Sequence, residues 1–196
     1  MTYVETVPEE GAPAEVAAMY EADREVFGAL PNFTKGLSLR PDVYAAWRQL
    51  NGAIKGNMDL RRYELATLAA ARRLRSTYCA LAHGSVLLTN QYLTPDTLRD
   101  VMEDHHAAGL EEADVAVMDL ADKVASDATA VTEADIDRLR SLGLTDAEIV
   151  DVVLAAAVRC FFSKTLDALG VQPDAAYRSL APDVRDALTV GRAIED

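Results

Sequence analysis

Aromatic residues, cysteines and basic residues are all scarce in this chain of 196 residues, and each scarcity excludes a class of protein. Two cysteines cannot build a disulfide framework, so the chain is not a small disulfide-bonded secreted domain. Only 19 basic residues stand against 32 acidic ones, and the net charge of -13 repels phosphate backbones. We therefore expect no nucleic-acid partner. Aromatic residues at 6% and abundant alanine favour closely packed helices over a sheet.

Long apolar runs are lacking as well. The longest, from Val152 to Val158, is far shorter than the roughly 20 residues that a membrane-spanning helix needs. Residues 1–5 have neither the basic nor the apolar region of a signal peptide. We therefore expect a protein of the reducing cytoplasm that has no contact with a membrane.

Turn residues and helix caps divide the chain into helical segments, and no stretch alternates apolar and polar residues as a strand does. Thr94-Pro95 pairs an N-cap with a proline at the first helical position, and Thr132 and Thr145 each open a sequence that resembles a capping box. We expect helices over residues 14–27, 41–55, 60–74, 76–89, 95–105 and 111–127, from 132, from 145 to 170, and after 173 and 182. The prediction is a single all-α domain over residues 1–196.

The most informative segment lies between residues 75 and 84, where a thiol and an imidazole stand four residues apart. Residues at this spacing share a helix face, so Cys79 and His83 are expected to touch or to share a water molecule. Ser76 falls on the same face and is placed to cap the helix. Cys79 is then the third helical residue, where free backbone N–H groups and the helix dipole favour a thiolate. The alternative interpretation is a small buried cysteine beside a hydrogen-bonded core histidine.

Glu64 supports the interpretation as a chemical site. It lies on the preceding predicted helix, within an apolar stripe that includes Leu60, Leu68 and Ala71. A buried carboxylate without a partner is unfavourable, so such a residue has a partner or a function. One alternative is an ion pair with Arg61. The other is that Glu64 reaches His83 or Cys79, directly or through water, and accepts a proton.

Other candidate residues have weaker signals. Tyr78, Trp47 and Tyr44 either line a pocket around the motif or pack in the core. His105 and His106 lie near a predicted helix end beside acidic residues and are expected on the solvated surface. No three or four ligands have the spacing of a metal site, so we expect no bound metal.

Glu64 followed by Ser76-Thr77-Tyr78-Cys79-Ala80-Leu81-Ala82-His83 resembles the AhpD-like alkylhydroperoxidase and carboxymuconolactone decarboxylase family. Its peroxidase members carry a glutamate, then Cys-x-x-Cys, then a histidine four residues later. The glutamate, second-cysteine and histidine positions match here. Segments 27–33, 39–41, 159–162 and 168–171 look like the peroxidase-related branch, and the resemblance covers roughly residues 26–175.

The resemblance implies an AhpD-like helical bundle that forms a homo-oligomer, either a dimer, a trimer or a hexamer. Ser76 stands where the family has its first motif cysteine, so the dithiol–disulfide cycle of the peroxidase members is closed to this chain. A thiolate at Cys79 can still attack a peroxide and become a sulfenic acid. Its reduction then needs an external thiol, or Cys160 if the fold brings that residue close.

Three functional hypotheses follow, and none requires a cofactor. The first is an antioxidant, peroxidase-like oxidoreductase that acts on hydroperoxides, with Cys79 as the reactive thiol, His83 and Glu64 as a proton relay, and Ser76 and Tyr78 in support. The second is acid–base chemistry by Glu64 and His83 on a small carboxylated or cyclic substrate, as in the decarboxylase members. The third is a non-catalytic family member that has kept only the fold.

Overall fold

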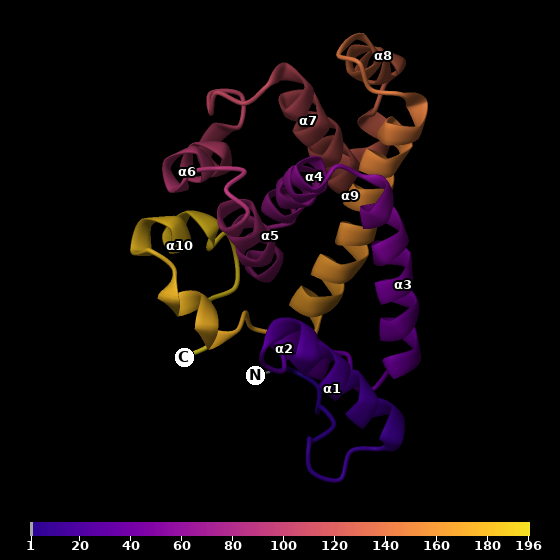
Figure 1. Ribbon diagram of the computed structural model, residues 1–196, viewed down its shortest axis with the longest axis vertical. Helices are drawn as coiled ribbons and strands as arrows, with labels where there is room; N and C mark the ends of the chain where they lie inside the picture. The colour runs from indigo at the N-terminus through magenta and orange to yellow at the C-terminus, as the bar shows by residue number, and fades with distance from the viewer. Residues whose placement is uncertain (1) are drawn as a thin grey trace.

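The computed structural model describes residues 2–196, and all regular elements in this part of the chain are helices (Figure 1). The all-α prediction is therefore confirmed. The elements are α1 (Ala14–Phe27), α2 (Asn32–Gly36), α3 (Pro41–Asn57), α4 (Leu60–Arg73), α5 (Thr77–Thr89), α6 (Pro95–Asp104), α7 (Glu112–Asp127), α8 (Glu133–Ser141), α9 (Asp146–Ala168) and α10 (Pro182–Leu188), with 3-10 turns at Ala128–Ala130 and Ala175–Ser179.

Local capping chemistry explains where several of these helices begin. Both predicted capping boxes are present, at Thr132 and at Thr145. At the second, the Glu148 carboxylate accepts a hydrogen bond from the Thr145 amide at 2.8 Å, while the Thr145 hydroxyl accepts one from the Glu148 amide at 3.3 Å. Asp59 caps α4 in the same way, with its carboxylate 3.0 Å from the amide of Arg62.

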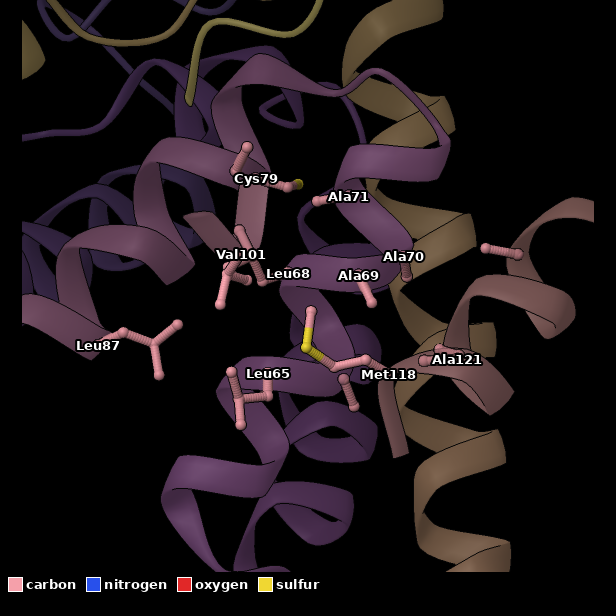
Figure 2. Packing of buried hydrophobic residues seen from close by; sticks show 14 of the residues in the cluster. Leu65, Leu68, Ala69, Ala70, Ala71, Cys79, Leu87, Val101, Met118 and Ala121 are labelled. Carbon is pink, nitrogen blue, oxygen red and sulfur yellow. The ribbon is translucent and has the colours of Figure 1, made fainter. Parts of the chain in front are cut away.

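Helix α4 is the central element of the fold, and it packs against α5, α7 and α9 (Figure 1). Its residues Ala69, Ala70 and Ala71 are fully buried, and these small side chains let the neighbouring helices approach closely. Figure 2 shows this packing, in which Leu65 and Leu68 of α4 lie among side chains of the surrounding helices and Cys79 of α5 lies at one edge of the group.

Helices α1 and α2 lie at one end of this bundle, and α3 runs along its flank beside α9 (Figure 1). The sequence did not predict α2, a single turn that begins directly after Pro31. The carboxylate of Asp174, which is distant in sequence, accepts a hydrogen bond from the amide of Asn32 at 2.8 Å and so fixes this turn. The three helices supply aromatic side chains to the candidate site described below.

Among residues 2–196 there is no helix with both the length and the apolar character needed to cross a membrane.

Candidate functional site

A carboxylate–imidazole pair joins the two helices that carry the sequence motif. Glu64 of α4 is buried, and its Oε2 lies 2.5 Å from Nδ1 of His83 on α5. The other oxygen, Oε1, accepts a hydrogen bond from Nζ of Lys55 at 3.2 Å. The predicted contact between Glu64 and His83 is therefore present. The alternative partner Arg61 instead forms an ion pair with Asp114.

The surroundings of this pair set its charge. Burial alone raises the pKa of Glu64, but His83 and Lys55 outweigh that effect and hold the pKa below its ordinary value of 4.5. Burial and the positive charge of Arg159 lower the pKa of His83 below 6.5, in spite of the neighbouring carboxylate. At neutral pH the carboxylate is ionised and the imidazole is neutral, and because Nδ1–H donates to Glu64, Nε2 is left as a base.

Cys79 occupies the third position of α5, as the sequence predicts, and only 2% of it is exposed. The polar contacts of its sulfur come from α9. The hydroxyl of Ser163 donates to Sγ at 3.1 Å, and Nη1 of Arg159 lies 3.7 Å from Sγ. Two donors therefore contact this sulfur, which lies in the first turn of α5.

Arg159 is a buried cation, with 4% of its surface exposed. Its contacts are Sγ of Cys79 and the hydroxyl of Tyr63, which lies 3.4 Å from Nη2. Within the described residues no carboxylate is within ion-pair distance of it, although buried arginines are ordinarily paired with one. Burial lowers the pKa of Arg159, and the attraction of Cys79 and Tyr63 more than offsets this, so the net pKa is raised. The sulfur of Cys79 and the phenol of Tyr63 are therefore its polar contacts.

The predicted trio of Cys79, His83 and Glu64 is therefore only partly assembled. Glu64 and His83 are in direct contact, whereas the polar contacts of Cys79 are with Arg159 and Ser163. Arg159 lies between Cys79 and the Glu64–His83 pair in its effects, because it contacts the sulfur and its charge also lowers the pKa of His83.

The capping role expected of Ser76 is not found, whereas Tyr78 packs in the core, one of the two alternatives left open by the sequence. Ser76 is the N-cap residue of α5 by position, but its side chain makes no capping hydrogen bond, so that expectation was wrong. Its buried hydroxyl has no hydrogen-bond partner among the described residues. The hydroxyl of Tyr78 donates to Asp174 and accepts from the amide of Phe33 at 3.2 Å. Tyr78 thus joins α5 to α2 and does not line the cavity described next.

A cavity of about 340 Å³ lies beside the carboxylate–imidazole pair. Its polar lining includes Glu64, His83, Lys55 and Arg159, and Cys79 is not among the lining residues. Its apolar walls are aromatic rings from α1, α2, α3 and α9, namely Phe27, Phe33, Tyr44, Trp47 and Phe162. Tyr44 and Trp47 are therefore pocket residues, one of the two alternatives left open by the sequence.

Sequence reasoning missed Arg159, Ser163 and Lys55. A signal for Arg159 was present, because a lone arginine follows the apolar run 152–158 within a helix too apolar to be solvated on all sides. Ser163 lies four residues later on the same helix face. Lys55 ends a helix next to α4, and nothing in its local sequence distinguishes it from a surface lysine.

His105 was expected at the surface but is buried. Its Nδ1 lies 2.8 Å from Nη2 of Arg72, and its Nε2 lies 2.9 Å from Oδ1 of Asp119. Ligand atoms of Asp104, His105 and His106 lie within 4.8 Å of one another. Both ring nitrogens of His105 already have partners, and Arg72 adds a positive charge, so this group is poorly suited to a metal cation.

Comparison with known proteins agrees with the resemblance found in the motif. Residues 41–123 match the family model of the carboxymuconolactone decarboxylase family. This matched part of the chain is similar to that family, and it contains Glu64, Cys79 and His83. No curated protein matches the sequence.

Solved structures extend the similarity over most of the chain. A peroxidase-related protein with an alkylhydroperoxidase AhpD core from Ralstonia eutropha JMP134 is 22% identical, covers 90% of this chain and 94% of its own, and has a TM-score of 0.81. A peroxidase-related protein from Silicibacter sp. TM1040 is 20% identical over 91% and 94% of the two chains, with a TM-score of 0.79. The C82A variant of the debrominase Bmp8, in complex with 2,3,4-tribromopyrrole, is 16% identical. The match covers 96% of this chain and 98% of the debrominase, with a TM-score of 0.75. These similarities establish the AhpD-like fold.

Proposed function

We propose that this protein is a peroxidase-like oxidoreductase that reduces hydroperoxides through the single thiol of Cys79. The observation that carries the proposal is the position of Arg159, a buried cation whose polar contacts are the Cys79 sulfur and the hydroxyl of Tyr63. A fixed positive charge beside a cysteine stabilises the thiolate, which is the nucleophilic form. Ser163 adds a second donor to the sulfur.

The reaction follows from these roles. Sγ of Cys79 attacks the terminal oxygen of the hydroperoxide, the O–O bond breaks, and Cys79 becomes a sulfenic acid while an alkoxide leaves. The proton lost by the thiol is held by the His83–Glu64 pair and returned to the alkoxide, which departs as an alcohol. The neutral ring of His83, one helical turn beyond Cys79, has the free Nε2 that this step requires. Sulfur is oxidised by two electrons, and the peroxide is reduced by two.

The enzyme is restored by an external thiol. One thiol displaces water from the sulfenic acid and forms a mixed disulfide, and a second thiol releases the Cys79 thiol and a small disulfide. Cys160 is a poor reaction partner, because burial raises its pKa and so reduces its thiolate fraction. The protein therefore turns over with one cysteine of its own.

The test is the consumption of a hydroperoxide in the presence of a small thiol. The wild-type protein and Cys160→Ser should turn over at similar rates, while Cys79→Ser should be inactive. Glu64→Gln should retain the thiol but turn over more slowly, because His83 loses the carboxylate that orients it. Equal activity of Cys79→Ser and the wild type would exclude this function.

A second candidate is acid–base chemistry on a small carboxylated or cyclic substrate. One observation favours it, namely that Glu64 and His83 line the cavity whereas Cys79 does not. With a lactone acid as substrate, Cys79→Ser should keep most of the turnover and Glu64→Gln should lose it. A non-catalytic protein would show no dependence on any of these residues with either class of substrate.

A further inference from the structure

An apolar groove runs between α3 and α9 on the outer side of these helices, distinct from the cavity beside the Glu64–His83 pair. Its volume is about 460 Å³, and every residue that lines it is apolar. Two of these residues, Leu50 and Phe161, are 53% and 46% exposed. A second groove of about 480 Å³ adjoins the first and shares Val43 and Phe161 with it. A continuous exposed apolar surface of this kind is typical of a protein interface.

Exposed apolar residues on both helices recur at alternating intervals of three and four residues. They are, on α9 and then on α3, Ala147, Val150, Leu154, Ala157 and Phe161, and Val43, Ala46, Leu50 and Ala53. In coiled coils and helical bundles, this spacing marks the stripe with which one helix packs against another. Here both stripes face solvent, and α3 and α9 run side by side in opposite directions (Figure 1). The two helices therefore present one half of a four-helix bundle.

Charges of opposite sign lie at the two ends of the α9 stripe. Lys164 is exposed and continues the stripe three residues after Phe161, while Asp151 lies three residues before Leu154. Neither of these charges forms an ion pair with another residue in the range 2–196. Ala157 lies midway between them, and its small side chain lets a facing helix approach closely. A two-fold axis beside Ala157 would place each Lys164 opposite the Asp151 of a second copy.

The area of this face is sufficient for a stable dimer. Helix α3 has 17 residues and is therefore about 25 Å long, and two helices side by side are about 20 Å wide. The face thus covers about 500 Å² on each copy, and a specific interface requires a total of about 1,000 Å². The adjoining groove, whose lining includes Leu39 and Leu169, extends the apolar surface beyond α3.

From these features we infer that a second copy of this chain binds the α3–α9 face about a two-fold axis near Ala157. The two pairs of helices then form an antiparallel four-helix bundle in which Lys164 lies opposite the partner's Asp151. A two-fold interface requires a self-complementary surface, and the symmetric placement of these charges favours a second copy over an unrelated protein. Trp47 lines both the groove and the cavity and stacks on Phe162 with ring centroids 3.9 Å apart, so the dimer would hold the cavity wall in place. The inference does not depend on the proposed function.

Sedimentation equilibrium tests whether this face joins two copies. The wild type should have about twice the 21.2 kDa mass of one chain, and Phe161→Glu should have the mass of one chain, because it places carboxylates inside the interface. Val26→Glu is the matched control, since Val26 is 62% exposed on α1 and outside the face, and this variant should remain dimeric. Both residues are exposed on the single chain, so neither change should alter the far-ultraviolet circular dichroism.

The mass of the wild type separates the possible assemblies. A monomer, a trimer, or a Phe161→Glu variant with the same mass as the wild type would overturn the inference. A hexamer that Phe161→Glu divides into trimers would support it, because such a hexamer contains the same two-fold interface.

An exchange of the two end charges tests the direction of the pairing. Lys164→Asp and Asp151→Lys should each raise the Kd of dimerisation by about tenfold, or roughly 1.4 kcal/mol, because each places like charges opposite one another twice in the dimer. The double variant Lys164→Asp/Asp151→Lys restores opposite charges, so its Kd should return to within about threefold of the wild-type value. An unchanged Kd in the single variants, or a double variant weaker than both, would overturn the two-fold arrangement.

Discussion

The pairing of Arg159 with Cys79 should be measurable as a coupling energy in protein stability. The perturbations are Arg159→Met, which keeps the length of the side chain and removes its charge, and Cys79→Ala. Nη1 and Sγ are 3.7 Å apart. Two unit charges at about 4 Å attract by roughly 4 kcal/mol at an effective dielectric constant of about 20, which sets an upper limit. Hydrogen bonds to charged groups contribute about 1.5–3 kcal/mol, and we expect a coupling in that range.

The assay is a double-mutant cycle of urea unfolding followed by far-ultraviolet circular dichroism. The free energies of unfolding of the wild type, both single variants and the double variant give the coupling directly. A control cycle combines Cys79→Ala with Arg138→Met, since Arg138 pairs with Asp119 at the surface, and this cycle should be additive. A coupling below about 0.5 kcal/mol for the first pair would mean that Arg159 faces a neutral thiol, and the argument for a thiolate would be refuted.

Three further predictions concern the polar groups around the cavity. Glu64→Gln should lower the free energy of unfolding by about 1–3 kcal/mol in urea titrations, because Glu64 bonds both His83 and Lys55. Stability should fall on acidification, because the folded-state pKa of His83 lies below 6.5 and that of Glu64 lies below 4.5. The unfolded chain therefore binds protons more tightly than the folded protein does. Thermal melts should show stability lost as the pH drops through these folded-state values, with no loss above pH 6.5. Asp23→Ala should lower the free energy of unfolding by about 1–3 kcal/mol, because the hydroxyls of Thr34 and Tyr44 lose the buried carboxylate that accepts their hydrogen bonds; an unchanged free energy of unfolding would contradict this.

Local signals in the sequence were sufficient for most of the helices. The capping residues Thr94 and Thr145 begin α6 and α9 as predicted, and the predicted bounds of α1 agree with the structure. These features depend on neighbours within one or two helical turns. Helix α2 was missed because its turn is fixed by Asp174, and the sequence does not show which distant residues a turn meets.

The same distinction explains what could be predicted of the site. Glu64 and His83 face each other because consecutive helices pack side by side, so a carboxylate in the apolar stripe of one meets the motif face of the next. The partner of Cys79 is 80 residues away in the chain, and only the packing of α9 against α4 and α5 brings Arg159 to it. The hydroxyl of Ser76 had a local capping role available, but it makes no capping hydrogen bond and is buried without a partner among the described residues.

The most direct test of the account is to identify the atom that a hydroperoxide oxidises first. The protein is treated with a sub-stoichiometric amount of cumene hydroperoxide, the sulfenic acid is captured with dimedone, and the modified peptides are located by mass spectrometry. The account predicts that label appears on Cys79 before Cys160 and that Arg159→Met slows this labelling. Label on Cys160 first, or no label on Cys79 while peroxide is consumed, would contradict it.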